Sequence, residues 1–305
     1  MLHAVIDIGS NTIRMAVYQI ADGGFEMLMK RKHTVGLAGC LEDGRLTRDG
    51  VETLVKILGG FVDLIDALGI ARVHAFATAA LRRAANRSAV LAEIERRTGV
   101  RVRVISGTEE AAYAFRGAAA SIPHADGIMA DIGGGSTEIV SFMGRAMQER
   151  WSLPLGSLAL RRTHVTGLFP TPAECAAIEA DVRDILAETP AVCALRAPHL
   201  VGLGGVLGSA ARLHALLAPT EPPRRITAAD LPPMIAMLGS GRPLAERDTA
   251  LLLRAAPDRL HNIVPGMIIA RVLADTFAAE DILYSDSGVR EGYIWKEIIG
   301  VEECF

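Results

Sequence analysis

The chain has 305 residues, and half of them are hydrophobic, which is enough apolar material for the cores of two domains. Its formal net charge is only −3, so no global basic field favours binding to nucleic acid or to a membrane surface. A polyanionic partner must therefore be bound by a local cluster of residues.

The cysteines and the start of the chain indicate a reducing compartment. Cys40, Cys175, Cys193 and Cys304 are widely scattered and show no metal-ligand spacing. The first predicted strand begins almost at Met1, which leaves no room for a signal peptide, and no uncharged apolar run is long enough to cross a bilayer. We expect a cytoplasmic protein.

The first third of the chain predicts strands alternating with helices after an initial hairpin. Apolar spacing and turn residues predict, in chain order, strands at 4–20 and 25–32 joined by a turn at Asp22-Gly23-Gly24, a helix at 47–68 ending at Gly69, a strand at 72–77, a helix at 88–98 and a strand at 100–105. Residues 118–127, with Pro123 and small residues, are the best boundary, after which a second α/β unit begins. Residues 219–233 hold five prolines and predict a surface loop.

Two short stretches read as one pattern written twice: AVIDIGSNTIRMAV at 4–17 and ADIGGGSTEIV at 130–140. In both, an apolar run typical of a buried strand ends in Asp-Ile-Gly, a tight polar segment follows, and apolar residues resume. This pattern is typical of a phosphate-binding turn. A hairpin turned by glycine is the alternative for either copy alone, and the repetition favours phosphate binding.

The residue types in these turns suit phosphate and a bridging cation. Glycine can take positive φ and carries no Cβ, so a glycine-containing backbone can aim N–H groups at phosphate oxygens. Asp7 and Asp131 would repel phosphate directly, so a carboxylate beside such a turn implies a divalent cation, with Mg²⁺ first. The glycines concerned and the side chains that add donors are Gly9, Gly133, Gly134 and Gly135, with Ser10, Asn11, Ser136 and Thr137.

A second candidate motif is SGTEEA at 106–111, where a strand ends and a helix opens. Thr108 is the predicted N-cap, and Glu109 and Glu110 fall in the first turn. Acids are favoured at this end of a helix by its dipole, which is the structural alternative. Because the motif lies where the first domain gives way to the second, a carboxylate here could also take a proton from water.

Two further segments could bind anions. Residues 201–209 predict a strand, a Gly-rich turn with Gly204 and Gly205, and a helix, an arrangement that suits either an anion or close packing of helix on strand. It does not satisfy the dinucleotide-binding fingerprint. Residues 284–292 place Arg290 after a strand end, where it could clamp a phosphate or lie on the surface.

Taken together, these motifs resemble the exopolyphosphatase and guanosine pentaphosphate phosphohydrolase family, in order and spacing over essentially the whole chain. The motifs that carry the resemblance are VIDIGSNTIRM, ATAALRRAAN at 77–86, ISGTEEA at 105–111, DIGGGSTE at 131–138, LPLGSLALR at 153–161, GLGG at 202–205 and SDSGVREG at 285–292. DIGSN, SG-x-EEA and DIGGGSTE together are highly specific.

The resemblance implies an α/β fold of two actin-like, ribonuclease-H-like domains with an interdomain cleft. Domain I would span 1–122 plus 289–305, and domain II 123–288, with hinge closure around 118–127 and the strand near Ser285. It also implies a hydrolase that removes the terminal phosphate of inorganic polyphosphate, or the γ-phosphate of guanosine pentaphosphate, with Mg²⁺ or alternatively Mn²⁺. A homodimer is common in the family.

Matching positions imply the roles of individual residues. Glu110 would be the general base for the attacking water, and Asp131 and Glu138 would serve the metal, with Asp7 as a further ligand. Phosphate would be held by Asp7, Gly9, Ser10, Asn11, Arg82, Gly133, Gly134, Gly135, Ser136, Gly204, Gly205 and Arg290.

This chain departs from the family pattern at three places. Val206 stands where many relatives carry a small hydroxylated residue, and Arg259-Leu260-His261 stands where Arg-Ala-Asp is common. Larger members continue into helical C-terminal domains, whereas this sequence stops at Phe305. With less basic surface to track a polymer, short polyphosphate is the expected substrate.

Two other functional classes remain open from the sequence. A sensor that binds guanosine tetraphosphate or pentaphosphate without turnover would keep the phosphate-binding turns, although the retained Glu110, Asp131 and Glu138 argue against it. A kinase of the actin-like superfamily would share both Asp-Ile-Gly turns, and SGTEEA and SDSGVREG argue against it. Phosphate release without an acceptor would exclude the kinase.

Overall fold

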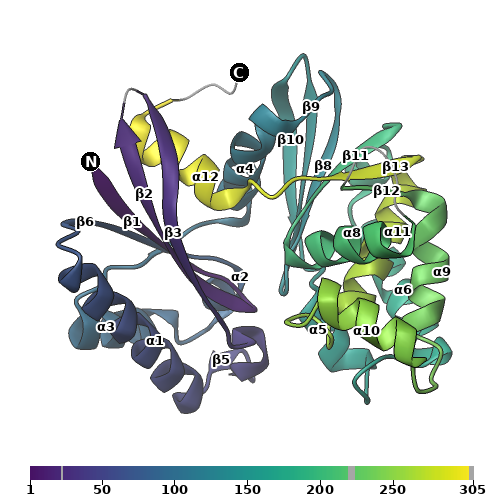
Figure 1. Ribbon diagram of the computed structural model, residues 1–305, viewed down its shortest axis with the longest axis horizontal. Coiled ribbons are helices and arrows are strands. Elements are labelled where there is room, and N and C mark those ends of the chain that lie inside the picture. Colours follow the sequence, from purple (N-terminus) through teal and green to yellow (C-terminus); the bar gives the residue numbers. More distant parts are fainter. Residues whose placement is uncertain (22, 219–223, 302–305) are drawn as a thin grey trace. The chain divides into compact units, whose positions relative to one another are not determined.

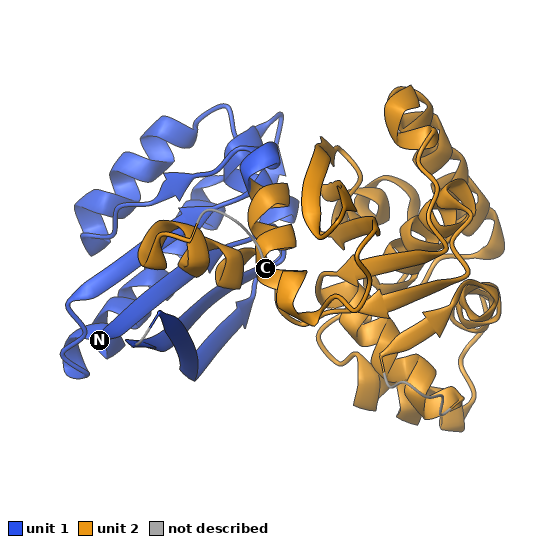
Figure 2. Ribbon diagram, turned by 90° about the horizontal axis from the view of Figure 1, so that it is seen from above, with its two compact units in different colours: residues 1–109 blue, residues 110–305 orange. Residues whose placement is uncertain are grey.

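The computed structural model describes residues 1–21, 23–218 and 224–301. It divides into two compact units, unit 1 at Met1–Glu109 and unit 2 at Glu110–Phe305, which Figure 2 colours separately. The domain limits of 1–122 plus 289–305 and 123–288 stay a prediction.

Unit 1 is built on a five-stranded sheet whose spatial order is β3-β2-β1-β6-β7 (Figure 1). β1, β2 and β3 are antiparallel, and β6 and β7 run parallel to β1. The elements of this unit are β1 (Leu2–Ile8), β2 (Thr12–Ala21), β3 (Gly24–Thr34), η1 (Leu37–Cys40), β4 (Leu41–Glu42), β5 (Arg45–Leu46), α1 (Arg48–Ala67), β6 (Arg72–Ala77), α2 (Ala79–Arg83), α3 (Arg87–Thr98) and β7 (Arg103–Val104).

Helix α1 forms for the reasons its sequence gives. Thr47 caps it by accepting a hydrogen bond from the Gly50 amide at 3.2 Å, and Gly69 follows its end with a φ of +64°. Its apolar stripe packs on one side of the sheet, against residues such as Ile6 and Ile8 of β1. The predicted helix is confirmed.

Two predictions in unit 1 need correction. Residues 4–20 form two strands, because a turn at Gly9 separates β1 from β2, and the strand expected at 100–105 is only Arg103–Val104. The turn that joins β2 to β3 contains Gly23, whose φ is +74°, while Asp22 lies outside the described residues. The Asp-Ile-Gly pattern does predict the turn at Gly9, so the error lies in the strand limits, which ran through that turn.

Unit 2 has a six-stranded sheet in the order β10-β9-β8-β11-β13-β12. Its elements begin with α4 (Gly107–Ala118), which spans the boundary between the units, and continue with η2 (Ala119–Ser121), β8 (Gly127–Ile132), β9 (Thr137–Met143), β10 (Ala146–Leu153), α5 (Ser157–His164), α6 (Pro172–Ala187), α7 (Pro190–Cys193), β11 (His199–Leu203), α8 (Gly205–Leu217), β12 (Arg225–Thr227), η3 (Ala228–Asp230), α9 (Leu231–Leu238), α10 (Glu246–Ala255), α11 (Ile263–Phe277), β13 (Asp281–Tyr284), α12 (Val289–Tyr293) and η4 (Ile294–Ile299).

The two sheets share one topology. In each, three consecutive antiparallel strands are followed by two strands parallel to the first: β1 to β3 with β6 and β7, and β8 to β10 with β11 and β13. The repeated Asp-Ile-Gly sequence closes the first strand of each sheet. The internal repeat in the sequence is therefore a repeat in the fold.

The proline-rich stretch contains regular structure from residue 225 onward, and residues 219–223 lie outside the described part of the chain. Strand β12 and helix α9 occupy residues expected to be loop, and Pro232 and Pro233 lie in the first turn of α9. That turn has no intrahelical hydrogen bonds for proline to lose, so prolines there start a helix instead of breaking it. The loop prediction is wrong at that end.

No helix in the described part of the chain is long and apolar enough to cross a membrane. Cys40, Cys175 and Cys193 are free thiols, each partly buried, and Cys304 lies outside the described residues.

Candidate active site

The two Asp-Ile-Gly turns have the same backbone geometry. In unit 1 the Gly9 amide donates to the Thr12 carbonyl at 3.0 Å, and in unit 2 the Gly133 amide donates to the Ser136 carbonyl at 2.9 Å. Neither glycine has positive φ, so the expected positive φ is wrong at both positions, and the second expected reason, the missing Cβ, is the one that applies. Glycine is needed for space: a Cβ on Gly133 would lie 2.8 Å from the Ser136 carbonyl oxygen.

The turn of unit 2 presents backbone donors that nothing in the described chain uses. The amides of Gly134, Gly135 and Ser136 form no hydrogen bond among the described residues. Successive free amides in a tight turn form a concave anion-binding site. The carbonyls of this turn, by contrast, are occupied: the Ser157 amide donates to Gly133 and the Leu158 amide to Gly134, both at 3.0 Å.

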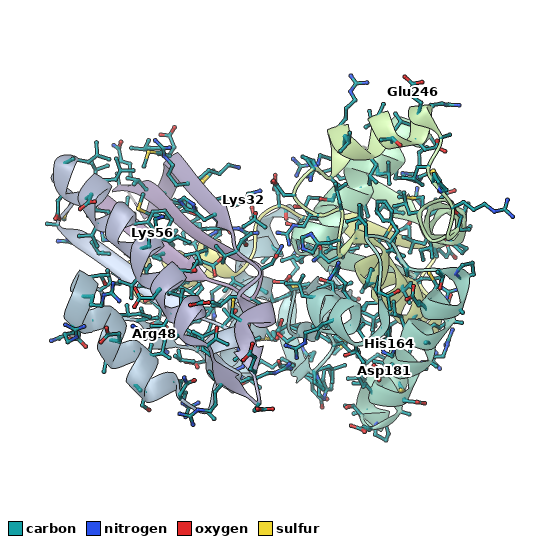
Figure 3. The ribbon with its side chains drawn as sticks, turned by 90° about the horizontal axis from the view of Figure 1, so that it is seen from below. Lys32, Arg48, Lys56, His164, Asp181 and Glu246 are labelled. Carbon is teal, nitrogen blue, oxygen red and sulfur yellow. The ribbon has the colours of Figure 1, made fainter. Side chains whose placement is uncertain are left out.

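Helix α5 holds the turn in place from behind. Its first amides, at Ser157 and Leu158, are the donors just described, and the Ser157 hydroxyl also donates to the Gly133 carbonyl at 3.1 Å. The far end of α5 is tied to α6 by His164 and Asp181, 2.8 Å apart (Figure 3). The helix therefore fixes the carbonyl side of the turn while its amide side stays open.

Asp131 and Glu138 lie directly opposite each other at the end of β8 and β9. Both are on the face that α4 covers, because each lies two residues along its strand from a residue that packs against that helix, Met129 in β8 and Val140 in β9. In unit 1 the equivalent pair is Asp7 and Arg14, whose charged groups are 3.8 Å apart. The turn of unit 1 thus balances its carboxylate internally, whereas the turn of unit 2 places two carboxylates together.

The two glutamates of SGTEEA have different surroundings. Glu109 accepts a hydrogen bond from the Ser106 amide at 2.7 Å, and its own amide donates to the Ser106 hydroxyl at 3.1 Å. This is a capping box, so Ser106 is the N-cap and the expected Thr108 is wrong. Contacts with Ser106 and Arg103 lower the pKa of Glu109.

Glu110 takes no part in this capping box and is buried, with 8% of its surface exposed. It is close enough to Glu138 for its charge to act on that group. The structural explanation offered for the glutamates therefore holds for Glu109 only.

Glu138 is almost completely buried, with 1% of its surface exposed. Burial raises its pKa well above the ordinary value, and the nearby charges of Glu110 and Asp131 raise it further. Hydrogen bonds from Ser152, at 2.7 Å, and from Ser136 act in the opposite direction. Two buried carboxyl groups, Glu110 and Glu138, and the partly buried Asp131 are thus near enough for their charges to interact, beside a turn with free amides.

This crowding gives a test by substitution. A carboxyl with a raised pKa favours the folded state when protonated, so the stability of the metal-free protein should fall as pH rises from 4.5 through the raised pKa. Glu138→Gln should lack this fall. At pH 8 without divalent ions we expect its thermal midpoint to exceed that of the wild type by about 2–4 °C, and its activity to be lost.

Thermal unfolding followed by circular dichroism at several pH values measures this. At pH 4, where the wild-type carboxyl is also protonated, the two proteins should unfold within about a degree of each other. If the thermal midpoints of the two proteins differed by the same amount at every pH, the ionised Glu138 carboxylate would not be the cause of the fall in stability.

The Gly-rich turn at 201–209 lies against the same strand end. A Cβ on Gly204, whose φ is +98°, would lie 3.0 Å from Asp131 Oδ1, and a Cβ on Gly205 would meet the Arg259 guanidinium. Arg259 is buried, with 8% exposed, at the N-terminus of α8. The two glycines are therefore needed for close packing, Gly204 against the end of β8 and Gly205 against the Arg259 guanidinium, which is a cation close to this strand end.

The two sequence departures have structural surroundings. Val206 is buried and packs on Gly266 of α11, so its side chain belongs to the core. His261 is half-buried; burial and the charges of Arg161 and Arg259 lower its pKa. The His261 imidazole, close to the Arg161 and Arg259 guanidinium groups, thus stands where many relatives have an aspartate.

The predicted site residues of unit 1 are placed as follows. Ser10 and Asn11 are buried at the turn, and both polar atoms of the Asn11 side chain have no partner among the described residues. Such an orphaned amide indicates a bound ligand or water. Arg82 donates to the Ile105 carbonyl at 3.3 Å. In unit 2, Arg290 pairs with Glu291 at 3.7 Å, and its contact with phosphate stays a prediction.

The carboxylates beside the turn of unit 2 suit a magnesium ion that also binds substrate. The described residues hold no group of three or more His, Cys, Asp or Glu side chains arranged as a metal site. Mg²⁺ does not require one, because it is commonly bound by one or two carboxylates, waters and substrate phosphates. Asp131 and Glu138, side by side next to free amides, fit that mode.

Three side chains of this region escaped the sequence analysis: Ser152, Ser157 and Arg259. Both serines lie far from the turn in sequence; no motif contains Ser152, and LPLGSLALR contains Ser157 without indicating its role. Arg259 was noted only as part of a departure from the family pattern.

Comparison with known proteins places the chain in a family. Residues 16–299 match the Ppx/GppA phosphatase family. Exopolyphosphatase 1 of Mycobacterium bovis is 30% identical over 304 residues, covering 96% of this chain and 87% of that protein, and its Mycobacterium leprae counterpart is 29% identical, covering 96% and 88%.

Solved structures agree. A Ppx/GppA family member from Aquifex aeolicus superposes with a TM-score of 0.77 at 30% identity, covering 99% of both chains. An exopolyphosphatase from Cytophaga hutchinsonii has a TM-score of 0.85 at 22% identity, covering 99% of both, and shows the fold alone. The repeated sheet topology and the motifs of the carboxyl cluster match this assignment, and the chain belongs to the Ppx/GppA phosphatase family.

Proposed function

We propose that the chain is an exopolyphosphatase that removes the terminal phosphate of inorganic polyphosphate. The observation that carries the proposal is the turn of unit 2, where three amides that have no partner among the described residues lie beside Asp131 and Glu138. Glu110 is close enough for its charge to act on Glu138. The relatives named exopolyphosphatase support the choice of substrate.

In this proposal each group has one task. The amides of Gly134, Gly135 and Ser136 bind the terminal phosphate, and Asp131 and Glu138 are the residues that would hold Mg²⁺, which would supply neutralisation of phosphate charge. Glu110 accepts a proton from a water molecule while the oxygen of that water attacks the terminal phosphorus. The phosphoanhydride bond breaks, giving orthophosphate and a polymer one phosphate shorter.

Guanosine pentaphosphate ends in the same kind of phosphoanhydride, and we propose it as a second substrate. Its products would be guanosine tetraphosphate and orthophosphate. Mn²⁺ is the proposed substitute for Mg²⁺, because it also accepts oxygen ligands.

The test is phosphate release by the purified protein with Mg²⁺ on short polyphosphate, long polyphosphate and guanosine pentaphosphate. We expect release without any acceptor, faster on short than on long chains, and none after removal of divalent ions with EDTA. Silence on all three, with tight guanosine tetraphosphate binding, would support the sensor. Transfer only to an added acceptor would support the kinase.

A further inference from the structure

Strand β10 brings a side chain to the carboxyl cluster that no sequence motif marks. Ser152 lies directly opposite Glu138 in the antiparallel pair β9–β10, and Glu138 lies directly opposite Asp131 in β8–β9. The three residues therefore form one row across three neighbouring strands. Directly opposite side chains in such pairs are close enough to interact.

The contact is short and well defined. The Ser152 hydroxyl donates to Glu138 Oε1 at 2.7 Å, a distance typical of a hydrogen bond to a charged oxygen. Ser152 approaches from the strand on the far side of Glu138 from Asp131. The hydroxyl thus holds the carboxylate on the side toward which repulsion from Asp131 pushes it.

The position of Ser152 is fixed by its own strand. The next residue, Leu153, is buried in the core of unit 2, and Trp151 packs against the same core, so the strand cannot slide without exposing both. A β-bulge between Met147 and Glu149 shifts the register by one residue. Without the bulge Trp151 would lie opposite Glu138.

We propose that Ser152 is a positioning residue that fixes the Glu138 carboxylate for metal binding during phosphate release, an inference that rests on the proposed function. A glutamate has three rotatable side-chain bonds, and Glu138 is repelled by two neighbouring carboxyl groups. Its hydrogen bond to Ser152, together with the one from Ser136, selects one orientation. Groups that orient a metal ligand in this way commonly alter affinity by roughly 10-fold to 100-fold when removed.

The test compares Ser152→Ala, Ser152→Thr and Ser141→Ala. Threonine keeps the hydroxyl and suits a strand. Ser141→Ala is the matched control, because its hydroxyl accepts from the Glu149 amide in the same strand pair but does not contact Glu138. Mn²⁺ binding without substrate, followed by electron paramagnetic resonance, is measured beside phosphate release and thermal unfolding.

We expect Ser152→Ala to weaken Mn²⁺ binding and to lower kcat, each by roughly 10-fold or more. Ser152→Thr should recover most of both, and Ser141→Ala should resemble the wild type. The Mn²⁺ measurement does not depend on turnover. If the wild type released no phosphate, the proposed function would fail, while weaker Mn²⁺ binding by Ser152→Ala would still support the positioning of Glu138.

Two results would overturn the inference. Mn²⁺ binding by Ser152→Ala equal to that of the wild type would show that the hydroxyl does not orient a metal ligand. Equal losses in Ser152→Ala and Ser152→Thr would show that the site responds to any change in packing at this position.

Discussion

Glu110→Gln is expected to lower kcat for phosphate release by roughly 1,000-fold, within the range typical of a lost general base. Glutamine preserves the size of the side chain but cannot accept the proton from water. Because Glu110 is buried beside another carboxyl group, removing its charge should not destabilise the fold. We expect the thermal midpoint of the variant to equal or exceed that of the wild type.

The adjacent glutamate offers a matched control. Glu109→Gln removes the carboxylate of the capping box with Ser106 and its ion pair with Arg103. Glutamine can still accept from the Ser106 amide, so the loss of stability should be small, about 0.5 kcal/mol from the partly exposed ion pair and the helix dipole, and kcat should stay within a few-fold of the wild type. Parallel phosphate-release assays and urea unfolding separate the two roles. Equal kcat values for the two variants would refute the assignment of Glu110.

Gly292→Ala is expected to destabilise the protein by about 3 kcal/mol or more, because the new methyl group has no room. In the folded protein its Cβ would overlap the Tyr113 carbonyl oxygen. The same holds for Gly117, whose Cβ would overlap the Gly288 carbonyl oxygen. Backbone atoms cannot rotate away as a side chain can, so α4 and α12 would have to separate.

The loss should extend to activity, because Glu110 lies in the first turn of α4. We expect phosphate release to fall at least about 10-fold at a temperature where the variant remains folded. Gly60→Ala, in the exposed middle of α1 with no atom within 4 Å of the new methyl, is the control and should gain about 0.5–1 kcal/mol. Urea unfolding gives both values, and a Gly292→Ala protein as stable as the wild type would contradict the packing argument.

Local signals made much of the fold predictable. The helix at α1, the strand at β6 and both Asp-Ile-Gly turns follow from short-range spacing, capping residues and glycines, and the structure confirms them. The prediction was wrong at α9 because proline disrupts a helix when it lies in the interior but is favoured in the first turn, where Pro232 and Pro233 lie. The sequence alone does not say which of the two applies.

The site was predictable only where a motif carried it. Asp131 and Glu138 are found because one hairpin turn joins them. Ser152 depends on the register of β10, which the bulge after Met147 moves by one residue. Counting from the turn between β9 and β10 would select Trp151, on the opposite face of the sheet. A bulge leaves no reliable sign in one sequence, so this partner of Glu138 required the structure.

The close approach of α4 and α12 has a consequence for the synthesis of the chain. Tyr113, 1% exposed in the folded protein, donates to Glu297 at 2.6 Å, and Gly117 contacts Gly288. These partners are made about 170 residues after α4 ends. At ribosomal rates of about 5–20 residues per second, this face of the helix waits uncovered for roughly 10–30 seconds. The helix that carries Glu110 therefore completes its packing only after nearly the whole chain has been synthesised.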